Sequence, residues 1–235
     1  MNINDYFVDS VWLKNTTDRF IGSGIFKDRF QKMSDKERKS LILHYVIDNE
    51  AFVFMNKPLL LEQVKQFLAD SILTINVEDI RLIINVEDIR LIGSAKIGFS
   101  LDPQKYGAPF CSTSDLDFTI INRELLDFLR KDYEFWSKAV KNGTLSTDVR
   151  SRRYWKENIR VIKNGLSKGY MDIHYLPNLK EYCPHAQLIA DTLSKIQIKL
   201  YEKQGIKIKQ CSVRVYKNYD LFFDYIERGI KKMLS

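Results

Sequence analysis

The chain has 235 residues, of which 45% are hydrophobic and 29% charged, proportions near those of globular proteins that exclude wholesale disorder. No apolar run approaches the ~20 residues that span a bilayer, and residues 1–10 lack the basic and apolar segments of a secretory signal, so we expect a cytoplasmic protein with no membrane partner. The 37 Lys and Arg exceed the 30 Asp and Glu by seven; this excess favours a polyanionic partner, although a positively charged surface without one is an equal alternative.

The three cysteines do not indicate a disulfide framework, because their number is odd and no pair has zinc-finger spacing. They are Cys111, Cys183 and Cys211. Cys183 and His185 could form half of a metal site, but no second half is visible. Buried or unused thiols are the preferred interpretation.

The first third of the chain predicts helices. Ser34 and Glu37 have the spacing of a capping box, and hydrophobic residues follow at helical intervals. Pro58 is typical of the first turn of a second helix. We therefore predict that residues 1–74 form a helical region packed on the rest of the chain.

A nine-residue sequence, INVEDIRLI, then occurs twice without interruption, at 75–83 and at 84–92. Two copies do not make a solenoid. The second copy runs directly into Gly93 and is predicted to be the strand that enters the site. The first copy must then be an extended helix end, a looped-out insertion or an added edge strand. An added apolar strand could pair with another chain and give a homo-oligomer.

The remaining elements alternate between the two types of secondary structure. Helices are predicted at 123–141, 152–164, 185–203 and 217–234, and strands at 114–122, 170–176 and 205–216. Together they predict an α+β fold with layered α/β character: a small mixed central sheet flanked by helices. The predicted core is 75–180, and 181–235 is predicted as a C-terminal helical region.

Three features within this core suggest chemistry. Gly93 and Ser94 follow a strand, where glycine permits close approach of the backbone to a ligand and serine can donate to a phosphate oxygen. Asp115 and Asp117 lie two apart at a strand start and so point to the same face, where their repulsion would be relieved by a divalent cation such as Mg²⁺. Asp172 lies between apolar residues of another strand, where an acid is costly unless it is paired or bound to metal.

In this order the features resemble the nucleotidyltransferase superfamily related to DNA polymerase β. The matching positions are Gly93 and Ser94, then Ser114, Asp115 and Asp117 in SDLDF, and finally Asp172. The stretch GSAKIGFSLDP followed by SDLDF is also similar to a group of bacterial proteins known as nucleotidyltransferase-domain proteins. The resemblance covers residues 84–177 and implies a central sheet of nucleotidyltransferase type.

The resemblance implies an enzyme that transfers a nucleoside monophosphate from an NTP, with ATP as the expected nucleotide, to a hydroxyl acceptor. Asp115 and Asp117 would hold two Mg²⁺ ions, which Mn²⁺ could replace, and Asp172 would hold the metal at the acceptor and help to deprotonate it. Gly93, Ser94 and Ser114 would contact the nucleotide, with Lys96 as a weaker phosphate contact.

The acceptor is left open between an RNA end, a protein hydroxyl and a small molecule, and a bacterial toxin or phage-defence role is one context. The alternative to an enzyme is a catalytically silent nucleotide- or nucleic-acid-binding module with the same fold, which the duplication favours. Basic residues in 150–168, interleaved with Tyr154 and Trp155, suit nucleic-acid contact or a solvated helix face equally. A second basic group is predicted to be ordinary surface: Lys207, Lys209, Arg214 and Lys217. His174 could touch substrate or be structural.

Overall fold

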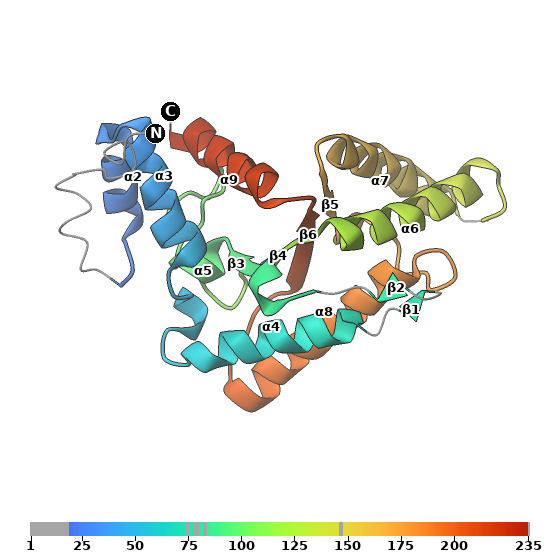
Figure 1. Cartoon of the computed structure of the whole chain (residues 1–235), viewed down its shortest axis with the longest axis horizontal. Helices are drawn as coiled ribbons and strands as arrows, with labels where there is room; N and C mark the ends of the chain where they lie inside the picture. Colours follow the sequence, from blue (N-terminus) through green and yellow to red (C-terminus); the bar gives the residue numbers. More distant parts are fainter. Residues whose placement is uncertain (1–18, 74–75, 78–79, 82–83, 146–147, 235) are drawn as a thin grey trace.

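The computed structural model describes residues 19–73, 76–77, 80–81, 84–145 and 148–234 (Figure 1). Within these ranges the chain forms eight α-helices and a four-stranded mixed sheet, which confirms the α+β prediction. The part of the predicted helical region at 1–18 and parts of the first repeat copy lie outside the described residues. None of the described helices combines the length and apolar character needed to cross a membrane.

The elements follow one another as helices, then alternating strands and helices. The helices are α2 (Ser23–Lys32), α3 (Asp35–Ile42), α4 (Pro58–Leu73), α5 (Ser94–Ile97), α6 (Arg123–Lys141), α7 (Val149–Ser167), α8 (Pro184–Gln204) and α9 (Tyr219–Leu234). Shorter helical turns are η2 (Leu43–Asp48), η3 (Phe52–Phe54), η4 (Val86–Asp88) and η5 (Ile173–Tyr175). The strands are β1 (Asn76–Val77), β2 (Ile80–Arg81), β3 (Ile89–Ile92), β4 (Leu116–Ile121), β5 (Tyr170–Asp172) and β6 (Cys211–Tyr216).

Local capping explains where several helices begin. Ser34 and Glu37 form the predicted capping box at the start of α3. Helix α7 begins three residues earlier than predicted, at Val149, because the Asp148 carboxylate accepts a hydrogen bond of 2.9 Å from the backbone N–H of Ser151. Helix α8 ends at Gly205, whose φ of 67° is the left-handed conformation that glycine adopts most readily.

The four-stranded sheet has the order β3-β4-β6-β5. Strand β4 is antiparallel to β3 and parallel to β6, and β5 is antiparallel to β6. Strand β6 is thus an inner strand, although it belongs to the region 181–235 that was predicted as a helical addition. Its alternating hydrophobic residues, Val213 and Val215, are buried, and the sheet needs them to fill its core.

The two faces of this sheet pack differently because side chains alternate along each strand. One face, which includes Ile89, Phe118 and Val215, is buried in the larger hydrophobic cluster with residues of α4, α6 and α8. Helices α4 and α8 lie side by side there (Figure 1). The other face carries Asp117, Ser212 and Tyr216 in alternate positions. Its apolar part joins the second cluster with residues of α2, α3 and α9.

The two identical repeat copies form different structures. In the first, β1 and β2 pair with each other as an antiparallel two-stranded sheet. The second copy forms η4 and then β3, the predicted strand leading to Gly93. Among the described residues, β1 and β2 do not join the four-stranded sheet; the rest of the first copy lies outside the described residues.

This difference predicts unequal effects of the same substitution in the two copies. Ile89 is fully buried against the sheet core, so Ile89→Ala is expected to lower the free energy of unfolding by about 2–5 kcal/mol. Its counterpart Ile80 lies in β2, outside that sheet, and Ile80→Ala is the matched control. Urea unfolding of both variants measures the two values. An equal loss would contradict the assignment of β3 to the second copy.

Candidate functional site

The turn at Gly93 lies directly against Asp117. Ile92 of β3 is paired with Asp117 of β4, so the next residue reaches the carboxylate. A Cβ atom added to Gly93 would lie 3.1 Å from Asp117 Oδ2, and the φ of Gly93 is 72°. Glycine therefore permits a close approach here that a larger residue would obstruct. The structure thus places the Gly93 turn, which leads into Ser94 at the start of α5, against Asp117.

Strand β6 and Gln210, the residue directly before it, supply one polar partner to each of the three acids. Gln210 Nε2 donates to Asp115 Oδ2 at 3.3 Å, and Ser212 Oγ donates to Asp117 Oδ1 at 2.6 Å. Arg214 contacts Asp172 with two nitrogens, at 2.5 Å from Nε to Oδ1 and 3.0 Å from Nη2 to Oδ2. The partners lie two residues apart and so share one face of the sheet.

Of the three candidate acids, Asp115 and Asp117 have no Lys or Arg within ion-pair distance in the described part of the chain. Burial raises the pKa of Asp117, and the nearby charges of Asp115 and Asp172 raise it further, while the hydrogen bond from Ser212 and the charge of Arg214 oppose the rise. Asp115 Oδ1 is buried without a hydrogen-bond partner among the described residues. An orphaned carboxylate oxygen beside a second carboxylate is the arrangement that a divalent cation would satisfy.

Asp172 lies elsewhere on the same face. Strand β6 separates β5 from β4, so Asp172 and Asp117 are separated by two strand spacings, about 10 Å, across the sheet. They are also offset along it by two residues, because Asp172 pairs with Arg214 and Asp117 with Ser212. Both Asp172 oxygens are used by Arg214, whose guanidinium also lies over the rings of Tyr170 and Tyr225 at 5.2 and 4.6 Å. Burial alone would lower the pKa of Arg214, but hydrogen bonding to Asp172 and its charge outweigh burial and raise that pKa.

These contacts revise two expectations. Arg214 is not ordinary surface: its side chain is 25% exposed and ion-paired with Asp172. Asp172, the third expected metal ligand, has both carboxylate oxygens in contact with Arg214. Within the described ranges, no three His, Cys, Asp or Glu side chains are arranged to hold a metal ion. In the sequence, Gln210, Ser212 and Arg214 alternate with less polar residues. This alternation predicts that the three polar side chains lie on one face of a strand, where they can contact the acids.

Ser114 and His174 are neighbours of Asp115 and Asp172 along the chain, but their side chains are not hydrogen-bonded to these acids. The Ser114 hydroxyl accepts a hydrogen bond of 3.1 Å from the Cys111 backbone N–H and so closes the turn before Asp115. The predicted strand 170–176 ends at Asp172, because residues 173–175 turn into η5 and bury Ile173. His174 is therefore exposed on a helical turn and does not share the strand face of Asp172.

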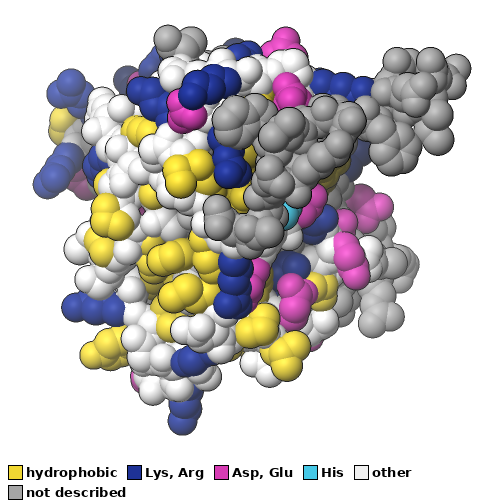
Figure 2. Space-filling view, turned by 90° about the vertical axis from the view of Figure 1, so that its left-hand side faces the viewer, with side chains coloured by type: hydrophobic (Ala, Val, Ile, Leu, Met, Phe, Trp, Pro, Cys, Tyr) yellow, Lys and Arg dark blue, Asp and Glu magenta, His cyan; other side chains and the backbone are white. Residues whose placement is uncertain are grey.

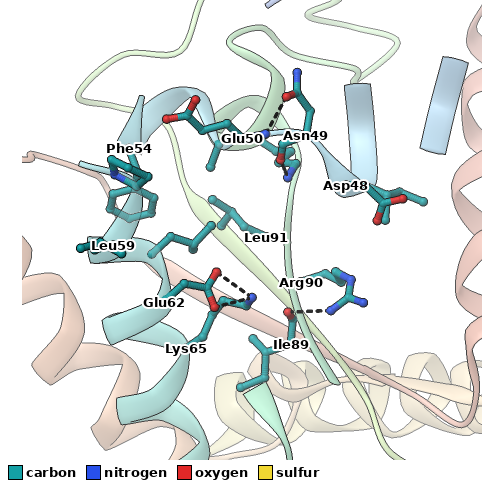
Figure 3. Close-up of a pocket in the computed structure, with 15 residues that line it drawn as sticks. Asp48, Asn49, Glu50, Phe54, Leu59, Glu62, Lys65, Ile89, Arg90 and Leu91 are labelled. Carbon is teal, nitrogen blue, oxygen red and sulfur yellow. Dashed lines mark hydrogen bonds and ion pairs between the residues drawn. The ribbon is translucent and has the colours of Figure 1, made fainter. Parts of the chain in front are cut away.

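Lys96 is directed away from the acids. Its side chain is only 4% exposed, and its Nζ donates to the backbone carbonyl of Asn49. It lines a cavity of about 380 Å³ between η2, α4 and β3, which none of the three candidate acids lines. Figure 3 shows Glu62 and Lys65 joined by an ion pair next to Ile89 in this cavity. The predicted contact of Lys96 with substrate phosphate is therefore not supported by its orientation.

Burial lowers the pKa of Lys96 from 10.5 to about 8. The folded chain consequently binds this proton more weakly than the unfolded chain. The buried charge therefore lowers the free energy of unfolding below pH 8, and this cost disappears as the pH rises from 8 to 10.5. Lys96→Met is expected to raise the free energy of unfolding at pH 7 by up to about 3 kcal/mol, with the gain vanishing near pH 10.5. Urea unfolding across this pH range tests it, with the exposed Lys195→Met as control. A pH-independent difference would contradict the explanation.

Cys183 and His185 belong to a structural contact at the start of α8. Asp132, only 3% exposed, accepts hydrogen bonds of 3.0 Å from the backbone N–H groups of His185 and Ala186. It also lies 2.6 Å from His185 Nδ1. The Cys183 thiol is buried, and burial raises its pKa. Asp132, which the sequence analysis did not single out, thus caps α8 and orients the histidine.

No protein-family model matches the chain, and no curated protein and no solved structure matches it either. The interpretation of the site therefore rests on the residues of this chain.

Proposed function

We propose that the chain is a metal-dependent nucleotidyltransferase that transfers a nucleoside monophosphate from an NTP to a hydroxyl acceptor, with a sheet of nucleotidyltransferase type. The observation that supports this most is the contact of the Gly93 turn with Asp117, beside an Asp115 oxygen that lacks a partner in the described chain. A glycine turn that could receive a phosphate, next to two carboxylates without an ion-paired Lys or Arg at the start of β4, suits a metal-bound triphosphate.

Asp115 and Asp117 would hold the metal, which we propose to be Mg²⁺ or Mn²⁺, since both carboxylates lack a cation in the described structure. A divalent ion held by these two carboxylates would neutralise phosphate charge and polarise the phosphoryl group. Asp172 does not fit as a further ligand while Arg214 occupies both of its oxygens. In this proposal Asp172 positions Arg214.

The chain's own residues then bind and orient the reactants. Gly93 lets the backbone approach the triphosphate, and the Ser94 hydroxyl donates to a phosphate oxygen. Gln210 and Ser212 fix the orientation of the two carboxylates through their hydrogen bonds. Such positioning, and not covalent chemistry, would be the protein's contribution to transfer.

The test is to incubate the purified chain with each labelled NTP, Mg²⁺ or Mn²⁺, total RNA and lysate. Label is expected to appear on one class of acceptor with release of pyrophosphate, and EDTA is expected to prevent it. Absence of metal-dependent NTP consumption with all four nucleotides would overturn the proposal.

A second candidate is a nucleotide-binding module of the same fold without turnover. The Arg214–Asp172 ion pair favours it, since it removes the third acid from any metal. Calorimetric NTP binding that depends on Asp115 and Asp117, with no transfer in the labelling assay, would support this second candidate over the first.

A further inference from the structure

Most of the excess positive charge of the chain lies in one helix. Residues 148–168, which comprise α7 and its two capping residues, hold seven basic and two acidic residues, so they carry +5 of the chain's +7. All seven basic residues are exposed: Arg150, Arg152, Arg153, Lys156, Arg160, Lys163 and Lys168. On the face shown in Figure 2, by contrast, basic and acidic side chains are interspersed.

Four of these residues form a row along the helix, which we call the α7 row: Arg152, Lys156, Arg160 and Lys163. Intervals of four, four and three residues keep them within about 80° of one another and about 5–6 Å apart along the axis. Asn158, Ile162 and Gly165 are buried on the other side. The row therefore faces solvent over about 16 Å, long enough to contact several successive phosphates.

Little negative charge offsets the α7 row. Arg160 pairs with Glu157 at 2.5 Å, but both side chains are more than half exposed, and such pairs contribute little. Arg152, Lys156 and Lys163 have no carboxylate within ion-pair distance among the described residues. The row consequently offers unneutralised charge to an external polyanion.

An open hollow of about 520 Å³ adjoins the N-terminal half of α7. Two arginines, one acid, a serine and an exposed ring line it: Arg150, Arg153, Glu157, Ser151 and Tyr154, which is 58% exposed. An exposed ring beside guanidinium groups suits the stacking of an unpaired base.

Helix α7 lies next to the end of β5 that carries Asp172. Asn158 Nδ2 donates to the Tyr175 carbonyl at 2.9 Å, which fixes the middle of α7 to the turn directly after Asp172. Helices α7 and α9 lie on either side of β5 and β6 (Figure 1). A polymer bound along α7 would therefore run beside the sheet that bears the candidate site.

We propose that the α7 row and the hollow at Tyr154 bind the phosphodiester backbone and a base of a single-stranded nucleic acid. An anionic membrane is the less suitable partner, because a membrane-binding helix needs an apolar face, whereas the large hydrophobic residues exposed on α7 are Val149 and Tyr154. Binding stands on the helix alone; that the bound strand is the acceptor rests on the proposed function.

Fluorescence anisotropy tests the binding with fluorescein-labelled 20-nucleotide oligouridine RNA and oligothymidine DNA, in EDTA and without NTP. The variant Arg152→Gln/Lys156→Gln/Lys163→Gln removes three charges from α7. The matched control, Lys195→Gln/Lys199→Gln/Lys203→Gln, removes three exposed charges at regular helical spacing on α8. Thermal unfolding verifies that both variants are folded.

The α7 variant is expected to bind at least tenfold more weakly at 100 mM KCl, with the slope of log K against log salt reduced by about 2. The α8 control is expected to stay within twofold of the unaltered chain. Tyr154→Ala is expected to weaken binding about fivefold or more without changing the slope. Whichever of the oligouridine RNA and the oligothymidine DNA binds more tightly shows whether the natural strand is RNA or DNA.

Equal loss in both triple variants, or unaltered oligonucleotide binding by the α7 variant, would overturn the proposal. The proposal would also be overturned if the α7 variant lost binding to phosphatidylserine vesicles but kept its binding to the oligonucleotides. Because the assay contains neither metal nor NTP, its result is independent of whether transfer occurs.

Discussion

Asp117→Asn is expected to abolish metal-dependent nucleotide transfer while the fold is retained. The substitution keeps the size of the side chain and an oxygen that can accept the hydrogen bond from Ser212. It removes the charge that, with Asp115, would bind the divalent ion. Loss of an outer-shell partner of a metal ligand costs 10- to 100-fold, so we expect loss of a ligand itself to lower transfer by more than about a hundredfold. Labelled-NTP turnover measures it.

Stability provides an independent readout of the same variant. Because burial raises the pKa of Asp117, its ionised form destabilises the folded chain at neutral pH. The Asp117→Asn variant is therefore expected to unfold at an equal or higher urea concentration than the unaltered chain at pH 7. The difference in their free energies of unfolding should shrink as the pH falls and Asp117 becomes protonated. The same change at the exposed Asp127 of α6 is the control and should leave transfer intact. Undiminished transfer by the Asp117 variant would refute its role.

Arg214→Met is expected to lower the free energy of unfolding by about 3 kcal/mol, because it leaves the Asp172 carboxylate buried without a counterion. The side chains of Arg214 and Asp172 are 25% and 15% exposed, so solvent screens the pair little. The double variant Arg214→Met/Asp172→Leu removes both charges and is expected to be more stable than Arg214→Met alone. Urea unfolding of the variants in a double-mutant cycle measures the coupling.

An exposed ion pair supplies the comparison for this cycle. Arg160 and Glu157 contact each other at the same 2.5 Å separation, but their side chains are 74% and 56% exposed. Arg160→Met is expected to cost less than about 1 kcal/mol. If Arg214→Met costs no more than Arg160→Met, or if the effects of the two Arg214–Asp172 substitutions simply add, Asp172 is not held by this pair.

The sequence predicted the elements that local chemistry determines. The capping box at Ser34, the helix that starts at Pro58 and the strand that follows Asp115 all occur as expected. The proximity of Gly93 to Asp117 is what the resemblance to nucleotidyltransferases implied. Strand β6 was harder, because its place between β4 and β5 depends on pairing between segments that are far apart in the chain. The role of Arg214 could not be deduced without that placement.

The duplicated nonapeptide shows this limit directly. Its two copies have the same intrinsic preferences, yet Ile89 is paired with β4 whereas Ile80 is paired with Val77 in a separate sheet. Only the surrounding chain distinguishes them. The nine residues themselves do not determine which copy becomes β3. The only difference visible in the sequence is that the second copy is followed directly by Gly93.

Strand β6 combines two tasks that are usually separable, since Val213 and Val215 fill the hydrophobic cluster while Ser212 and Arg214 hold the acids. A slip of this strand by one residue would turn both sets to the opposite faces at once. The guanidinium would then enter the apolar layer, and valine would stand opposite the acids. A form with the strand out of register would thus lose both its hydrophobic packing and the contacts that hold Asp117 and Asp172. The chain can therefore fold stably only with these acids correctly aligned.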